Sequence, residues 1–350
     1  MMTLKMLDTK LDSIPVSTAW NLSWLAEAKG RQELYSNRSP QKLKTLKEHA
    51  LIQSAVSSNR IEGVEVKKAR VGTVIFGRKL LNDRDEEEVR GYRDALGLIH
   101  EKGCKLGVTE KTILVLHKLA RGKVWDAGSY KKEESDIIEK YKDGRSRVRF
   151  RTVQAAQTPL FMKKLVADYQ KVLNEQRIPP LILAIAFNLD FLCIHPFRDG
   201  NGRVSRLLLL LEIYRCGLEV GRYVSIERLI EQNKERYYET LEESSKGWHE
   251  GRHDPWPYIN YVLFILKEAY RDFERKLQSA AVQKGEKSSL IFNAVQNMNE
   301  PFKISMIKEE VPGASLELIR KVLKNLQAEG RVKCLGRGPN AQWKRLKPVK

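Results

Sequence analysis

Residues 195–206 bring together side chains that could carry out phosphate chemistry. His195 has an ordinary pKa of about 6.5, so it can accept a proton from an incoming hydroxyl near neutral pH. Asp199 offers one hard oxygen ligand of the kind that Mg²⁺ takes when phosphates and water complete its shell. Gly200 and Gly202 lack the Cβ atoms that would keep a phosphate away from backbone amides. Together these residues indicate a phosphate-transfer site.

The flanking residues predict a polar loop that leads into a helix. Apolar stretches at 181–192 and 207–211 indicate two buried helices, one on each side of the motif. The first amides of a helix have no internal partner and carry positive charge, so the amides of Asn201 and the two glycines can bind an anion. Arg203 and Arg206 fall on one helix face and can hold further phosphate oxygens.

Each of these features alone has a simpler structural explanation. A histidine before a proline is more often structural than catalytic, and a lone G-x-G is more often a turn than a phosphate cradle. No packing rule, however, requires an imidazole, a carboxylate, two glycines and paired arginines at these intervals. The combination therefore favours a functional site.

The segment HPFRDGNGRVSR resembles the H-P-F-x-[D/E]-G-N-G-R-x-x-R signature of the Fic family at every defined position. The resemblance covers roughly residues 1–275 and implies a small all-helical core. Most studied members with an intact motif transfer AMP from ATP to a hydroxyl side chain of a target protein. It implies that His195 is the base, that Asp199 holds Mg²⁺, and that ATP phosphates lie on Gly200, Asn201, Gly202, Arg203 and Arg206.

A second motif precedes the first by more than a hundred residues. The pattern predicts a helix over about 44–63, ended by Gly63, with Glu62 in the last turn, where the helix dipole disfavours a carboxylate. By spacing alone, an exposed glutamate is the simpler interpretation. Ser58 to Gly63 nevertheless fits the autoinhibitory [S/T]-x-x-x-E-[G/N] motif of the family. That resemblance implies that Glu62 pairs with Arg206 and holds it away from the γ-phosphate.

Two further segments border the predicted core. Residues 136–141 and 146–150 flank Lys142-Asp143-Gly144 and predict a hairpin. It is either an ordinary surface hairpin or, as the resemblance implies, a flap over about 128–152 that positions the target segment. In relatives the helix predicted at 225–241 borders the adenine pocket, which makes Asn233 a candidate for base contact.

The C-terminal residues have a different pattern. A short polar linker is expected at 278–287, and residues 288–350 predict three helices and a hairpin that resemble a winged helix-turn-helix domain. Residues 287–350 contain thirteen Lys/Arg and five Asp/Glu, with Arg320, Lys321 and Lys324 on the third helix. This domain either binds DNA or is a protein-docking or dimerisation domain of the same shape.

The whole-chain composition is that of a basic globular protein. The chain has 350 residues, 42% hydrophobic and 31% charged, with a net charge of +19. This charge suits polyanionic partners such as ATP, nucleic acid or an acidic protein, although it also serves solubility alone. No apolar run approaches the ~20 residues that a membrane span needs, and residues 1–13 have no secretory core. Four widely spaced cysteines indicate reduced thiols, so a cytoplasmic location without membrane contact is expected.

The sequence therefore predicts a mainly α protein built from a Fic-type helical bundle with a β-hairpin flap and a C-terminal winged helix-turn-helix domain. The expected order is an N-terminal helical region (1–107), a catalytic core (108–277), the linker and the winged helix. The predicted function is AMP transfer from ATP to a Ser, Thr or Tyr hydroxyl of a protein, which includes the chain itself, with inhibition by Glu62. The alternatives are removal of AMP, with Glu62 orienting a water, or a DNA-binding regulator that uses the site as a nucleotide sensor. The sequence does not identify the target protein, and it does not decide whether the chain forms a homodimer.

Overall fold

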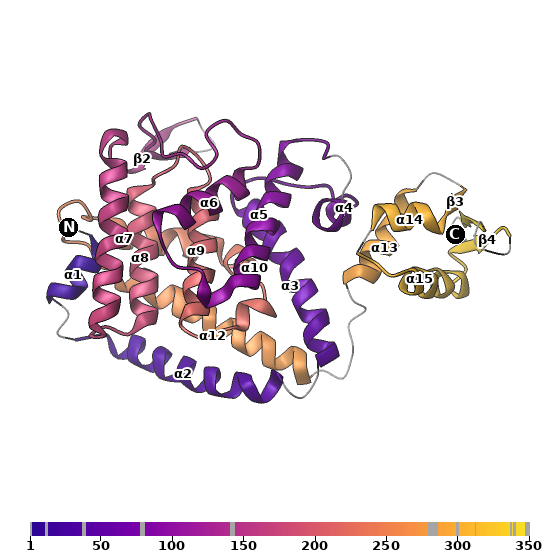
Figure 1. Ribbon diagram of the computed structural model, residues 1–350, viewed down its shortest axis with the longest axis horizontal. Coiled ribbons are helices and arrows are strands. Elements are labelled where there is room, and N and C mark those ends of the chain that lie inside the picture. The colour runs from indigo at the N-terminus through magenta and orange to yellow at the C-terminus, as the bar shows by residue number, and fades with distance from the viewer. Residues whose placement is uncertain are drawn as a thin grey trace. The chain divides into compact units, whose positions relative to one another are not determined.

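The computed structural model describes residues 2–10, 13–36, 40–77, 81–140, 144–278, 286–298, 301–311, 313–336, 338 and 341–346 (Figure 1). The chain is mainly helical and divides into two compact units. The first unit contains residues 1–64 and 91–278, and the second contains residues 65–90 and 279–350. The predicted division differs in one segment, because residues 65–90 cluster with the C-terminal residues and not with the N-terminal region. Among the described residues, no helix is both long enough and apolar enough to cross a membrane.

Two buried helices form the centre of the first unit, as the sequence predicts. In α8 (Pro180–Ile194) every residue after the first is buried, and a helix that is apolar all round belongs inside a core. It packs against α9 (Asn201–Arg215), which follows the polar motif. The other helices of this unit surround the pair and have the following bounds (Figure 1): α5 (Arg84–Lys102, shared with the second unit), α6 (Glu110–Arg121), α7 (Thr158–Glu175), α10 (Ile226–Gln232), α11 (Lys234–Ser245) and α12 (Trp256–Gln278), with short 3-10 turns η1 (Gly103–Lys105), η2 (Ala155–Gln157) and η3 (Val220–Arg222).

The helix predicted to be inhibitory is α3 (Pro40–Ile61). Gly63 adopts a left-handed φ of 83°, and the Val64 amide donates to the Asn59 carbonyl at 3.0 Å, so the helix ends in a Schellman motif. Lys234 Nζ donates to the Ile61 carbonyl at 2.8 Å and satisfies another of the last carbonyls. The end of α3 is thus fixed both by the residues that directly follow it and by Lys234 of α11.

Polar contacts also hold α3 against α10. Ser54 Oγ donates to Glu227 Oε2 at 2.6 Å inside the core, and Arg60 pairs with Glu231 at 2.9 Å nearer the surface. Glu227 is buried and also accepts from the Tyr92 hydroxyl at 3.1 Å. A buried carboxylate needs such donors, so these contacts fix where α3 lies on the core.

The N-terminal helices α1 (Thr3–Lys10) and α2 (Val16–Ser36) complete the first unit, and α1 is anchored by one buried carboxylate. Asp190 of α8 accepts hydrogen bonds from the backbone amides of Thr3 at 2.7 Å and Leu4 at 3.0 Å and from Trp248 Nε1 at 2.7 Å. These amides belong to the start of α1, where a negative charge is favoured.

Replacement of Asp190 by asparagine is expected to lower the free energy of unfolding by about 2–3 kcal/mol, because one of three buried donors would then face an amide NH₂ group. Chemical denaturation of the full chain measures this. The control is Asp94→Asn, which removes a half-exposed partner of Arg93 and should cost under about 1 kcal/mol. Equal, small effects for the two variants would contradict the anchoring role.

The predicted hairpin is present as β1 (Ile137–Lys140) and β2 (Ser146–Phe150). The strands pair antiparallel, with Ile138 opposite Val148, and the register shifts between Ile137 and Ile138. Ile138 and Val148 are both about half exposed. Gly144 has a φ of 84°, as a tight turn requires, whereas Lys142 and Asp143 lie outside the described residues.

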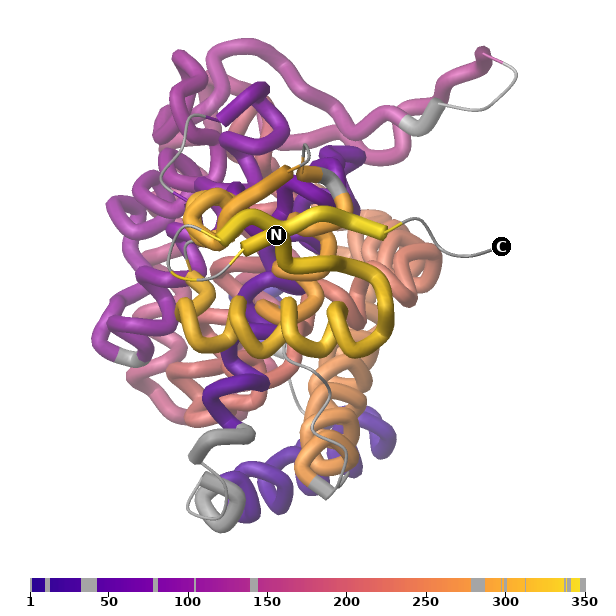
Figure 2. The backbone as a smooth tube through the Cα atoms, turned by 90° about the vertical axis from the view of Figure 1, so that its right-hand side faces the viewer, coloured from indigo at the N-terminus to yellow at the C-terminus, as the bar shows by residue number. Residues whose placement is uncertain are grey.

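The second unit contains the three helices and the hairpin expected from the C-terminal sequence (Figure 2). A three-stranded antiparallel sheet has the order β3-β5-β4, and Ser315 caps α15 by accepting from the Leu318 amide at 3.1 Å. Most of the predicted linker, 279–285, lies outside the described residues. The elements are α4 (Val71–Phe76), α13 (Glu286–Asn297), β3 (Phe302–Lys303), α14 (Ile304–Glu310), α15 (Leu316–Ala328), β4 (Val332–Cys334) and β5 (Gln342–Arg345).

Candidate active site

The motif loop leaves α8 through a residue in an uncommon backbone conformation. His195 has a φ of 54°, and its amide still donates to the Phe191 carbonyl at 2.9 Å. A non-glycine residue in this left-handed region costs about 1 kcal/mol or more, so the surrounding structure must impose it. Phe197 is fully buried, and the Pro196 carbonyl accepts from the Lys131 amide at 2.8 Å. These anchors fix the loop around His195, which is partly buried.

The contacts of His195 define which nitrogen can act as a base. Nδ1 lies 3.3 Å from the Leu192 carbonyl, which can only accept, so Nδ1 carries the proton. Nε2 is then the unprotonated nitrogen. Burial lowers the pKa of His195 to about 4, outweighing the Leu192 hydrogen bond, which favours the charged form. The ring is therefore neutral at pH 7 and able to take a proton.

The Asn201 side chain has a structural role within the motif loop. Its Oδ1 accepts from the Phe197 amide at 2.9 Å, and its Nδ2 donates to the Phe197 carbonyl at 2.7 Å. The side chain is buried and closes the motif loop on itself. Only the Asn201 backbone amide, at the start of α9, is placed to bind an anion.

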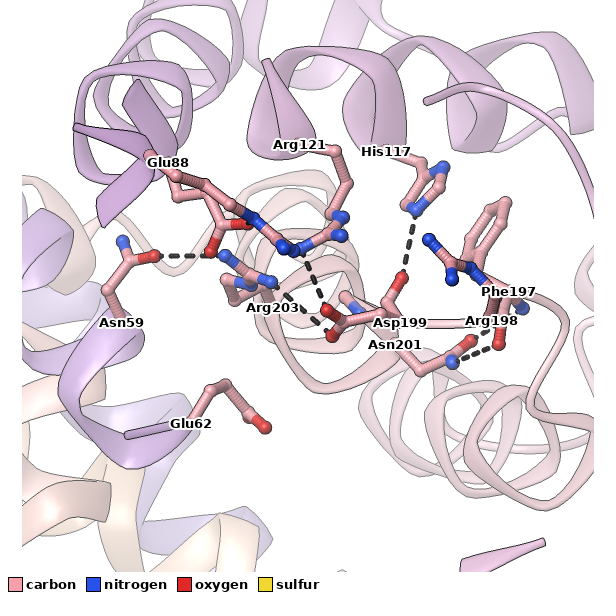
Figure 3. A network of polar contacts seen from close by, with 12 residues as sticks. Asn59, Glu62, Glu88, His117, Arg121, Phe197, Arg198, Asp199, Asn201 and Arg203 are labelled. Atoms are coloured by element: carbon pink, nitrogen blue, oxygen red, sulfur yellow. Dashed lines mark hydrogen bonds and ion pairs between the residues drawn. The ribbon is translucent and has the colours of Figure 1, made fainter. Parts of the chain in front are cut away.

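Two residues of α6, which the sequence analysis did not select, hold the motif from outside (Figure 3). His117 stacks on the Phe197 ring with centroids 3.7 Å apart. Its Nδ1 accepts from the Gly128 amide at 2.9 Å, so its Nε2 carries the proton and donates to the Asp199 carbonyl at 3.0 Å. Burial lowers the pKa of His117 to about 4, which keeps this neutral form.

Arg121, one turn after His117, contacts the side-chain carboxylate of Asp199, whereas His117 contacts its backbone carbonyl. Arg121 is buried, and its NH1 lies 2.9 Å from Asp199 Oδ2 (Figure 3). A Cβ on Gly200 would lie 2.9 Å from the Arg121 Cδ, and Gly200 has a φ of 86°. Glycine is thus required at position 200 for both its backbone conformation and this close packing. The spacing of His117 and Arg121 gave no sign in the sequence that α6 contacts the motif.

Asp199 is the one carboxylate of the motif, and its side chain is 50% exposed. Oδ1 accepts from the Gly200 amide at 2.5 Å and lies 3.5 Å from Arg203 NH2. No group of three or more His, Cys, Asp and Glu side chains that could hold a metal is present in the described part of the chain. Mg²⁺ often binds through one carboxylate with phosphates and water, so a single half-exposed Asp199 fits that ion when a nucleotide supplies the other ligands.

The two motif arginines each contact the end of α3. Arg206 is buried, and its Nε donates to Ser58 Oγ at 2.8 Å. Its NH2 donates to the Ser58 carbonyl and to Glu62 Oε1, both at 2.8 Å. Burial alone would lower the pKa of Arg206, but the charge of Glu62 and neighbouring groups raise it above its ordinary value. The structure thus brings Ser58, Glu62 and Arg206 together, as the resemblance implied.

Arg203 has a contact with α3 that the sequence analysis missed. Its NH1 donates to Asn59 Oδ1 at 3.2 Å, and Asn59 Nδ2 donates to the Ala55 carbonyl at 2.8 Å (Figure 3). Both side chains are buried. Asn59 occupies a position that the Ser58–Gly63 motif leaves undefined, so no pattern could select it.

The Glu62 carboxylate lies against Gly202, one residue of the predicted anion site. A Cβ on Gly202 would lie 2.2 Å from Glu62 Oε1 and 3.2 Å from Arg206 NH1. The missing Cβ at position 202 is therefore what lets an anionic oxygen approach the start of α9. In this structure that oxygen belongs to Glu62, whose side chain is 30% exposed.

Asn233, the candidate for base contact, stands between α10 and α11 and uses its amide locally. Its Nδ2 donates to the Leu229 carbonyl at 2.8 Å. The ring of Tyr237 is buried against Tyr238, Tyr258 and Tyr261, with centroids 5.2–6.3 Å apart, as expected of packing residues. Base contact by Asn233 is left as a prediction.

The model of the Fic/DOC family matches residues 107–213, which contain α6, the hairpin, α8 and the motif. This segment of the chain therefore resembles a Fic/DOC domain. The chain is 24% identical over 229 residues to the protein adenylyltransferase Fic of Drosophila erecta and 25% identical over 228 residues to that of Aedes aegypti. Each alignment covers 63% of this chain, which spans only about two fifths (41%) of the length of either relative.

Solved structures show the same Fic fold. A Fic family protein from Desulfovibrio desulfuricans G20 superposes with a TM-score of 0.61 at 21% identity, over 97% of this chain and 98% of that one. A Fic domain containing signaling protein from Bacteroides thetaiotaomicron gives a TM-score of 0.62 at 20% identity, over 75% of this chain and 99% of that one.

Proposed function

We propose that this chain is a protein adenylyltransferase that transfers AMP from ATP to a Ser, Thr or Tyr hydroxyl of a protein, its own included. The observation that carries the proposal is the arrangement of a neutral His195, with Nε2 available as an acceptor, beside an anion site at the start of α9. The match of residues 107–213 to the Fic/DOC family model and the adenylyltransferase names of the relatives support this activity.

Each residue then has a defined task. The phosphates of ATP lie on the first amides of α9, with Arg203 and Arg206 neutralising their charge. Asp199 would hold Mg²⁺, which supplies charge neutralisation on the phosphates when bound. His195 Nε2 takes the proton of the attacking hydroxyl, whose oxygen bonds to the α-phosphorus while the bond to pyrophosphate breaks. Most of the rate enhancement is attributed to positioning and preorganised charge.

The same contacts make Glu62 an inhibitor in this proposal. Its carboxylate occupies the place beside Gly202 that a phosphate oxygen would take, and it binds the NH2 of Arg206. Arg206 is then turned toward α3 and away from the nucleotide. The exposed, paired strands β1 and β2 are proposed to position the target segment, and Ile138 and Val148 supply an apolar surface for it.

Transfer of label from α-labelled ATP to protein tests the proposal. Wild type, Glu62→Gly and Glu62→Gly with His195→Ala are compared at equal concentration. Label that rises with the first substitution and disappears with the second is the expected result. If no variant becomes labelled while each still binds ATP, adenylyl transfer is rejected. Release of AMP from a protein that already carries it would then identify the reverse reaction.

The pH profile of transfer should reflect the lowered pKa of His195. The base must be neutral, so activity is present above its pKa of about 4 and is lost as the pH falls through that value. Initial rates of the Glu62→Gly chain at saturating ATP should be flat between pH 6 and 8. A rate that halves near pH 6.5, with circular dichroism unchanged, would show that His195 has the ordinary pKa of a histidine and would contradict the prediction.

A further inference from the structure

The basic residues of the C-terminal segment fall into two groups. Some serve the fold of the second unit: Lys308 Nζ donates to the Ala314 carbonyl at 2.6 Å, Arg345 donates to the Gln296 carbonyl, and Arg331 lies over the Phe292 ring. The side chains of six others have no hydrogen-bond or ion-pair partner within the described residues. These are Lys303, Arg320, Lys321, Lys324, Lys333 and Lys344.

Three of the six lie on the outer face of α15. Arg320, Lys321 and Lys324 are exposed, whereas Ile319 and Leu323 on the opposite face are buried in the core of the unit. The thirteen residues of α15 give a helix about 20 Å long.

The other three lie on the outer face of the sheet. Lys333 of β4 and Lys344 of β5 are directly opposite each other in the register, and both are exposed. Lys303 of β3 pairs with Gln342, two residues before Lys344, and therefore shares this face. Like charges opposite each other across two strands destabilise a sheet, so the fold itself does not account for them. A polyanion bound to this face would remove that repulsion.

We propose that the outer faces of α15 and of the three-stranded sheet form a binding surface for double-stranded DNA. An α-helix fits the major groove of B-form DNA, whose width is about 12 Å, and three cations on its outer face can meet phosphates and base edges there. The major groove of an RNA duplex is too deep and narrow for this. α15 runs beside the sheet and packs against β4, so the lysines of the sheet can follow the adjacent backbone (Figure 2).

Fluorescence anisotropy of a labelled 20-base-pair duplex of mixed sequence, titrated with the full chain, tests this surface. Each phosphate contact contributes about 0.9 to the slope of log affinity against log salt, so six contacts predict a slope near −5. Arg320→Gln, Lys321→Gln and Lys324→Gln together should reduce the slope by about 3 and the affinity at least tenfold, and Lys333→Gln with Lys344→Gln should reduce the slope by about 2.

The matched control is Lys163→Gln with Lys164→Gln, two exposed lysines of α7 in the first unit, which should leave the slope unchanged. Absence of duplex binding in wild type would overturn the inference, and so would equal loss in the control. Binding of labelled heparin without any duplex binding would indicate a general polyanion surface and would also overturn the inference. AMP transfer, measured separately, does not enter this result.

A different observation links the second unit to Glu62. The first unit's N-terminal segment ends at Val64, two residues after Glu62, and the chain then enters the second unit. There α4 is fixed to the C-terminal residues: Thr73 Oγ1 donates to the Glu310 side chain at 2.7 Å and contacts its carbonyl at 3.1 Å. A Cβ on Gly313 would lie 3.0 Å from the Phe76 ring, so the turn after α14 fits closely against α4.

We infer that the second unit controls the inhibition by holding the residues that follow Glu62; this rests on the proposed function. Loosening α4 from α14 frees the segment after Gly63 and weakens the contact of Glu62 with Arg206. Thr73→Val keeps the size of the side chain and removes both hydrogen bonds. It should raise AMP transfer several-fold in the wild-type chain and leave it unchanged in the Glu62→Gly chain.

The two backgrounds separate this inference from the proposed function. Labelling of the Glu62→Gly chain alone reports whether the site transfers AMP at all. If that chain is active but Thr73→Val has no effect, or has the same effect in both backgrounds, the second unit does not act through Glu62. Ser305→Ala, which removes an exposed hydroxyl of α14, is the matched control and should change neither background.

Discussion

AMP transfer by the Glu62→Gly chain is expected to fall about 10²- to 10⁴-fold when His195 is replaced by alanine, because the attacking hydroxyl then loses its general base. The Nδ1 contact with Leu192 and the lowered pKa keep Nε2 of His195 unprotonated, and the left-handed backbone at this residue fixes where the ring begins. Initial rates with α-labelled ATP measure the loss, and calorimetric titration with ATP should show that nucleotide affinity changes little.

A suitable control for this substitution is His249→Ala. The His249 ring is exposed, contacts the Arg151 carbonyl at 2.7 Å and stacks on the Phe150 ring with centroids 5.5 Å apart. Transfer by that variant should stay within about twofold. A His195→Ala chain that retains most of its activity would mean that another group, or water alone, accepts the proton.

Replacement of Glu62 by glycine is expected to raise AMP transfer by about 10- to 100-fold. The contact with Arg206 is a hydrogen bond between charged groups, worth about 1.5–3 kcal/mol, and Arg206 is buried. Its loss frees both Arg206 and the place beside Gly202. The gain should appear in the rate of labelling under saturating ATP.

The substitution Glu62→Gln distinguishes the effect of the Glu62 charge from the effect of the space that its side chain fills. The amide still fills the place beside Gly202 but binds Arg206 more weakly, so an intermediate rate is expected. Glu65→Gln, which removes an exposed charge three residues further on without adding a glycine to the chain, should have an effect under twofold. If Glu62→Gln and Glu65→Gln behave alike, the charge of Glu62 does not restrain the site.

The sequence by itself determined the parts of this protein that depend on local rules. The apolar runs before and after the motif predicted α8 and α9, and Gly63 predicted the end of α3, because helix periodicity and left-handed glycines are local properties. Ser58, Glu62 and the 195–206 motif were found because their spacing along the chain matches the family.

Only the tertiary structure decided which distant residues complete the site. His117, Arg121 and Asn59 reach the motif from helices far away in the chain, and their contacts leave no pattern in the sequence. The structure likewise shows that the Asn201 side chain closes the motif loop, because a buried amide needs partners for its polar atoms.

The assignment of residues 65–90 to the second unit likewise depends on packing. Their helical pattern does not specify a partner, and Thr73 contacts Glu310 although the two are 237 residues apart in the chain. Pairing of this kind depends on which apolar and polar surfaces are left to be covered, and local propensity carries no information about that choice.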